Sequence, residues 1–214
     1  GLYMDQFTYA ERATDWRGNN NIAESMFTQM QRERFAVPRW IVVGAGTGGT
    51  SATIGRWVRL QRHATQVCVA DPEGSVFSAY HRTRDVQLTA CGSRIEGIGR
   101  PRVEPSFIPT LVDRMEEVPN LESVAAMQLL CALLGRRVGP STGTNFVAML
   151  RLATAMRDSG EQGSILSLLC DAGERYLCTY HNADWVQQQF GDAAPARQQL
   201  QQVLDHQGQA RRWV

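Results

Sequence analysis

Apolar residues along the chain follow two alternating patterns, one typical of buried strands and one typical of amphipathic helices. Short apolar runs, which predict strands, occur at 39–43, 66–70 and 164–170, and 112–118 is a further candidate strand. Segments with apolar residues at helical spacing separate them, at 22–35, 51–62, 120–134 and 145–158. Continuous apolar strands alternating with helices are typical of a parallel sheet that is covered on both faces. The pattern therefore predicts a three-layer α/β fold.

Capping residues mark several helix boundaries. Asn21 with Glu24 three residues later forms a capping-box pattern at the start of the first long helix. We expect Asn120 to cap a later helix and Gly135 to end it, since glycine favours the left-handed conformation found there. Residues 71–93 show no clear periodicity, and we expect them to be mostly irregular.

The composition changes near residue 190. Glutamine occurs seven times between residues 187 and 202, and the few apolar residues, Leu200, Val203 and Leu204, give at most one weak amphipathic helix. A solvated or partly disordered segment is the favoured interpretation. We therefore expect one α/β domain over 1–190 and a Gln-rich tail, weakly helical or disordered, over 191–214.

Composition and charge exclude several classes of protein. The net charge is +1 with interspersed charges, which indicates no nucleic-acid partner. No apolar run approaches the roughly 18 residues of a membrane span, and no signal peptide opens the chain. The five cysteines are odd in number and widely spaced, without metal-binding spacing, which favours a reducing cytoplasm.

One count bears directly on chemistry. All 22 basic residues are arginine, so the chain has no lysine. Whatever the cause, no side-chain amine is available here to form a Schiff base with a carbonyl compound.

The segment IVVGAGTGGTSA at 41–52 has the pattern of a strand, a glycine turn and the start of a helix. Glycines let the backbone approach an anion, and the free N–H groups at a helix N-terminus bind phosphate. Gly44, Gly46 and Gly49 also match a dinucleotide-binding GxGxxG pattern, with Asp71 placed to bind a ribose. The loop therefore predicts a phosphate site but leaves its ligand open.

Further motifs make the resemblance specific. The loop GTGGT at 46–50 is followed, in order, by DPEGS at 71–75, IEGIG at 95–99, GPSTG at 139–143 and CDAGERYL at 170–177. This succession resembles the pyridoxal-phosphate-dependent cysteine synthase and cystathionine β-synthase family, a fold type II family whose large domain is related to tryptophan synthase β. The opening stretch and the segment around IEGIG look closest to its bacterial L-cysteine desulfhydrase branch.

The resemblance implies a role for each motif. It assigns the cofactor phosphate to Gly46, Thr47, Gly48, Gly49 and Thr50. It assigns a hydrogen bond with the pyridine nitrogen to Ser141, and the substrate side to a mobile loop at Gly97, Ile98 and Gly99. It implies pyridoxal phosphate as cofactor, no metal, and L-cysteine or a related β-substituted amino acid as substrate.

The resemblance also implies what the chain lacks. The family's Schiff-base lysine and its Ser/Thr-Gly-Asn substrate loop precede the region that is matched, so we expect a C-terminal part of a family member. The intact protein would be a cytoplasmic homodimer, and the lysine-free chain alone would be inactive. The motifs do not separate desulfhydrase from synthase or β-synthase. Two alternatives stay open, an NAD(P)- or FAD-binding domain and a non-catalytic half-domain that needs a partner chain.

Overall fold

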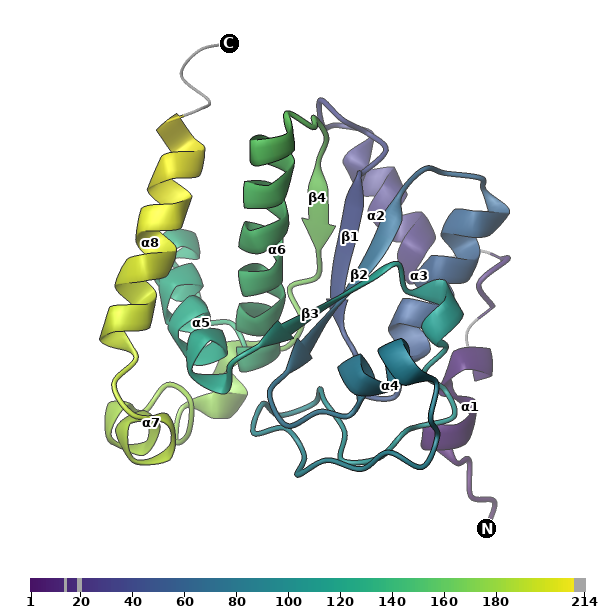
Figure 1. Cartoon of the computed structure of the whole chain (residues 1–214), viewed down its shortest axis with the longest axis horizontal. Coiled ribbons are helices and arrows are strands. Elements are labelled where there is room, and N and C mark those ends of the chain that lie inside the picture. The colour runs from purple at the N-terminus through teal and green to yellow at the C-terminus, as the bar shows by residue number, and fades with distance from the viewer. Residues whose placement is uncertain (14, 19–20, 210–214) are drawn as a thin grey trace.

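The structure, a computed structural model, describes residues 1–13, 15–18 and 21–209. Its centre is a parallel sheet with the order β3–β2–β1–β4 (Figure 1). The strands are β1 (Trp40–Gly44), β2 (Gln66–Pro72), β3 (Arg114–Val118) and β4 (Ile165–Ser167). The helices are α1 (Gln6–Ala13), α2 (Ile22–Met30), α3 (Gly49–Leu60), α4 (Phe77–Thr83), α5 (Asn120–Leu134), α6 (Pro140–Ser159), α7 (Ala183–Phe190) and α8 (Ala194–Gln209). Short 3-10 helices form at η1 (Pro109–Leu111) and η2 (Gly173–Tyr176).

Helices cover both faces of the sheet, as the apolar pattern predicts. Ile41 and Val43 of β1 are fully buried in a cluster with residues of α2 and α3. Val42, which points to the other face, is buried in a cluster with Ala148 and Leu152 of α6. Burying each of these side chains stabilises the fold by about 1.5–3 kcal/mol. The three-layer α/β prediction is confirmed, with α6 on one face and α2 and α3 on the other (Figure 1).

The helix that carries the GPSTG motif begins earlier than predicted. Helix α6 starts at Pro140, not near residue 145, because proline at the first position has the helical φ already set. Gly143 therefore lies within the helix, where it serves packing. A Cβ there would be 2.1 Å from the carbonyl oxygen of Ser123 in α5. The glycine lets α5 and α6 approach closely, and Ser141 lies in the first turn of α6.

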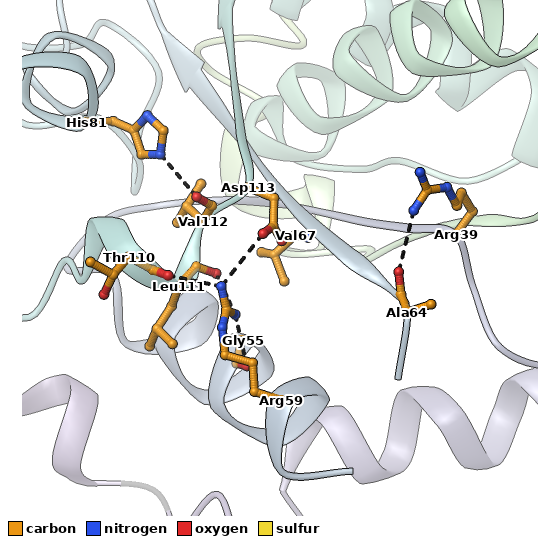
Figure 2. Close-up of polar contacts among 10 residues, drawn as sticks. All are labelled: Arg39, Gly55, Arg59, Ala64, Val67, His81, Thr110, Leu111, Val112 and Asp113. Carbon is orange, nitrogen blue, oxygen red and sulfur yellow. Dashed lines mark hydrogen bonds and ion pairs between the residues drawn. The ribbon is translucent and has the colours of Figure 1, made fainter. Parts of the chain in front are cut away.

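The back of helix α3 is fixed by one arginine (Figure 2). The Arg59 guanidinium donates hydrogen bonds to the carbonyl oxygens of Thr110, at 2.9 Å, and Leu111, at 3.3 Å, and lies 3.6 Å from the Asp113 carboxylate. Asp113 in turn accepts a hydrogen bond from the Val67 amide at 2.7 Å, where β2 begins. These contacts join the C-terminal end of α3 to the segment that leads into β3.

Cap and strand predictions were partly right. The Asn21 side chain accepts from the Glu24 amide at 3.0 Å, and Gly135 ends α5 with φ of 62°, as predicted. At α5, however, Pro119 occupies the capping position instead of Asn120. Strand β4 has three residues instead of seven, and at the end of the predicted run the Cys170 amide donates to Thr142 Oγ1 and not to a neighbouring strand.

Two segments are more ordered than their sequences indicate. Helix α4 forms within 71–93, where the buried Asp71 carboxylate accepts from the Ser78 amide at 2.8 Å in its first turn. Helix α8 spans 194–209, and Leu200 is buried against the cluster of α5 and α6. Within the segment expected to be weakly helical or disordered, residues 194–209 form a helix, and apolar contacts with distant helices support it. The residues from 210 onward lie outside the described part.

Candidate active site

The glycine loop lies where β1 ends and α3 begins, at the carboxyl edge of the sheet (Figure 1). Gly48 precedes the helix with φ of 93°, a conformation that L side chains rarely adopt. The first amides of α3 have no carbonyl partner within the helix, and the helix dipole adds positive potential there. Thr47 is half-buried and Thr50 is exposed, so both are accessible to a ligand. This arrangement can bind a phosphate dianion.

Two glycines let other segments approach the loop. A Cβ on Gly46 would be 2.4 Å from the carbonyl oxygen of Gly97, and a Cβ on Gly48 would be 2.5 Å from the Cα of Phe107. The Gly99 amide donates to the Ala45 carbonyl at 2.8 Å. The structure therefore brings the predicted phosphate loop and the predicted substrate-side loop into direct contact, although they are some 50 positions apart in the sequence.

Ser141 and its helix form the next part of the site. Ser141 is buried in the first turn of α6, and Asn145 lies one turn later on the same face. Asn145 Oδ1 lies 3.5 Å from the position of a Cβ on Gly44, where the side chain of Ile98 also packs. The helix face with Ser141 is thus directed at the end of β1, next to the phosphate loop and Ile98.

Asn145 is a candidate site residue that the sequence interpretation missed. Its side chain is 1% exposed, and its Oδ1 has no hydrogen-bond partner among the described residues. A buried amide oxygen without a donor costs about 1–3 kcal/mol, which a bound ligand can relieve. The only signal in the sequence was a polar residue one helical turn after Ser141.

Asp71 is not available to bind a ribose. Its side chain is 2% exposed, and its Oδ2 accepts from the Ser78 amide at 2.8 Å. Burial raises the pKa of Asp71, and hydrogen bonds with Ser75 and Ser78 offset part of that shift. The acid that a dinucleotide site needs at the end of β2 is therefore buried beneath α4.

An arginine lies over the glycine loop. Arg100 Nε donates to the carbonyl oxygen of Gly46 at 3.0 Å, and its guanidinium lies 4.6 Å from the ring centre of Phe7. The guanidinium adds positive charge beside the predicted phosphate site. Among the described residues no group of three or more His, Cys, Asp or Glu side chains could hold a metal ion. No described helix is both long and apolar enough to cross a membrane.

Comparison with known proteins identifies the family. The family model described as pyridoxal-phosphate dependent enzyme matches residues 1–171. The chain belongs to this family. It is 58% identical over 195 residues to the L-cysteine desulfhydrase of Mycobacterium tuberculosis (strain ATCC 25177 / H37Ra), covering 91% of this chain and 53% of that protein. It is 28% identical to cysteine synthase 2 of Schizosaccharomyces pombe (strain 972 / ATCC 24843), covering 87% of this chain and 48% of that protein.

A third relative is more distant. The chain is 27% identical to cystathionine beta-synthase of Saccharomyces cerevisiae (strain ATCC 204508 / S288c), covering 69% of this chain and 29% of that protein. The chain thus spans about half the length, or less, of these curated relatives. The resemblance to the cysteine synthase and cystathionine β-synthase family, and to the desulfhydrase branch, is confirmed.

The described residues fit pyridoxal phosphate, the cofactor of this family. The loop at Gly46, Thr47 and Gly48, with only one side chain, and the start of α3 offer donors for its phosphate. The face of α6 with Ser141 and the unpartnered Asn145 oxygen provides buried polar groups for a ring. The fit is with the cofactor's phosphate and ring. The amine that the aldehyde requires is absent from this sequence.

Proposed function

We propose that this chain provides the cofactor-binding part of an enzyme that eliminates or replaces the β-substituent of L-cysteine or a related amino acid. The observation that carries the proposal is the contact between the glycine loop and the Gly97–Ile98–Gly99 loop at the N-terminus of α3. The family match and the similarity to an L-cysteine desulfhydrase support it. Release of sulfide, pyruvate and ammonia from cysteine is the elimination outcome, and exchange of the β-substituent is the replacement outcome.

Each part of the site has a distinct task in this proposal. When bound, the cofactor supplies an electron sink for the α-carbon of the amino acid. The amides of 46–50 and the hydroxyls of Thr47 and Thr50 bind the phosphate, while the Ser141 hydroxyl bonds to the ring nitrogen and fixes the ring's orientation. Ile98, which is 9% exposed, excludes water from the end of β1.

The task that this chain cannot perform is the covalent anchoring of the aldehyde. Because none of the 214 residues is lysine, the amine is contributed by polypeptide outside this sequence. The edge of the sheet at β4 supports association with further polypeptide. Strand β4 pairs only with β1 among the described strands, and beside it Leu168 is half-buried and Leu169 is 51% exposed.

We propose that the intact protein is a cytoplasmic homodimer.

Ligand binding tests the proposal directly. Pyridoxine phosphate, which has the phosphate and ring but no aldehyde, is titrated into the chain by calorimetry, with NADH as a second ligand. We expect pyridoxine phosphate to bind and NADH not to bind. Thr50→Val and Ser141→Ala should each raise the dissociation constant about twofold to tenfold, because each removes one hydrogen bond to the ligand. Thr28→Val, at an exposed position on α2, is the matched control.

Activity provides the second test. The chain supplied with pyridoxal phosphate and L-cysteine should release no sulfide, because the lysine is lacking. Sulfide release by this chain alone would contradict the proposed division of tasks. Tight NADH binding without pyridoxine phosphate binding would overturn the proposed function as a whole.

A further inference from the structure

One buried hydroxyl group bonds to the backbone on the N-terminal side of the loop that contacts the phosphate site. Tyr180 Oη donates a hydrogen bond to the carbonyl oxygen of Arg94 at 2.7 Å and accepts one from the amide of Glu96 at 3.1 Å. Tyr180 is 5% exposed, and burial raises its pKa, so the phenol keeps the proton that it donates. One side chain from a segment 84 positions away thus bonds to the backbone on both sides of Ile95.

Tyr180 is itself fixed by surrounding rings. Its ring centre lies 5.5 Å from that of Tyr176, 5.0 Å from that of Trp185 and 6.0 Å from that of Phe190. Arg94 adds a second attachment, since its guanidinium lies 4.7 Å from the centre of the Phe190 ring. Such aromatic contacts contribute energy beyond their buried area, so the hydroxyl has a defined position.

The C-terminal side of the loop has its own anchors. The Gly99 amide bonds to the Ala45 carbonyl at 2.8 Å, and Arg100 bonds to Gly46 at 3.0 Å. Between the two anchors lies Gly97, exposed, with φ of 88° and no atom within 4 Å of a Cβ built there. The loop is therefore attached at both ends, and between them Gly97 has open space at its Cβ position while its carbonyl faces Gly46.

The same aromatic cluster reaches the opposite wall of the site. The ring of Tyr176 comes within 3.0 Å of a Cβ built on Gly139, directly before α6 and Ser141. The Tyr176 hydroxyl bonds to Asp171 Oδ2 at 2.5 Å, and the Asp171 carbonyl accepts from the Gly139 amide at 3.1 Å. The two neighbouring tyrosines thus position the two walls, Tyr180 the loop with Ile98 and Tyr176 the start of α6.

We propose that Tyr180 is a positioning residue that holds the Gly97–Ile98–Gly99 loop against the phosphate site. Its hydroxyl bonds keep the Gly97 carbonyl beside Gly46, and loss of those bonds lets the loop move away about Gly97. The proposal rests on the proposed function only for its consequence on ligand binding, since the loop's attachment is independent of which ligand binds.

Tyr180→Phe tests the proposal, because it removes the hydroxyl and keeps the ring packing. Hydrogen exchange of the full chain, followed by NMR, reports on the Glu96 amide, and calorimetry measures pyridoxine phosphate binding. We expect exchange at Glu96 to become about threefold to tenfold faster and the dissociation constant to rise by a similar factor. Tyr176→Phe, which loses a hydroxyl bonded to Asp171 and not to the loop, should leave exchange at Glu96 unchanged. Exchange within α5 shows whether each variant is folded.

The outcomes separate the two proposals. If the unaltered chain fails to bind pyridoxine phosphate, the proposed function is refuted, while faster exchange at Glu96 in Tyr180→Phe still supports the loop attachment. If the unaltered chain binds and Tyr180→Phe shows unchanged exchange or unchanged affinity, the positioning role is overturned. Should Tyr180→Phe not fold, Phe190→Leu removes a ring packed on Tyr180 and keeps the hydroxyl. A smaller rise in Glu96 exchange is then expected, and no rise overturns the proposal.

Discussion

Replacing Gly48 by alanine is the most direct test of why glycine occupies the start of α3. Gly48 has φ of 93°, and a Cβ there would be 2.5 Å from the Phe107 Cα and 2.8 Å from the Ser106 carbonyl oxygen. Real Cβ atoms essentially never approach other atoms this closely. Because both obstacles are backbone atoms, no side-chain rotation can relieve the clash, and either the loop or the 106–107 segment has to move.

The magnitude follows from two separate costs. A left-handed backbone conformation costs an L residue about 1–2 kcal/mol. Forcing an extra carbon into a packed contact costs about 1–3 kcal/mol more. Gly48→Ala should therefore lower the free energy of unfolding by about 2–5 kcal/mol. Gly97→Ala is the matched control, since Gly97 has a similar φ of 88° but nothing within 4 Å of its Cβ position, so only the first cost of about 1–2 kcal/mol applies.

Urea denaturation followed by circular dichroism measures both free energies of unfolding. With a slope of about 1–3 kcal/mol per molar urea, a difference of about 2 kcal/mol between the variants shifts the midpoint by about 1 M. Gly48→Ala should also weaken pyridoxine phosphate binding, because the first amides of α3 are displaced. Equal destabilisation by the two substitutions would refute the argument that close backbone approach, and not φ alone, requires glycine at position 48.

Three other predictions concern buried groups elsewhere in the fold. Asn145→Leu removes the unpartnered buried amide oxygen, so the free energy of unfolding should stay equal or rise by about 1 kcal/mol. Pyridoxine phosphate binding should weaken in the same variant. A lower free energy of unfolding with unchanged binding would contradict this prediction. Burial raises the pKa of the Cys68 thiol from 9.0 to about 12, so between these pH values the unfolded chain releases a proton that the folded chain keeps. The contribution of Cys68 to the free energy of unfolding, measured relative to Cys68→Ala, is therefore constant below pH 9 and falls by about 1.4 kcal/mol per pH unit above it. Urea denaturation of both proteins at pH 8 and pH 10.5 measures this change. A free energy of unfolding that changes equally with pH in both proteins would disprove the pKa shift. Leu200→Ala should lower the free energy of unfolding, measured by urea denaturation, by about 2–5 kcal/mol because α8 packs on the core. Gln199→Ala, at an exposed position, should change it little. A small change for both variants would contradict the packing of α8 on the core.

The sequence by itself determined the class of fold and the family. Strand and helix order follow from apolar runs that bury on both sides, as at Ile41 to Val43, and such local patterns survive in any context. The GTGGT loop predicts a phosphate site, because glycines and a helix start together favour anion binding. The absence of lysine, which excludes a Schiff base on this chain, required only counting.

Only the tertiary structure decided which residues meet. The sequence around Gly143 predicts a turn, but in the structure Gly143 lies inside α6, where it allows Ser123 of α5 to approach closely. Asp71 fits a ribose acid by spacing, yet α4 covers it. Tyr180 and Asn145 carried no motif, because their importance comes from contacts with Glu96 and Gly44, distant in sequence. Long-range contacts of this kind depend on how the whole chain packs, and a local pattern contains no information about them.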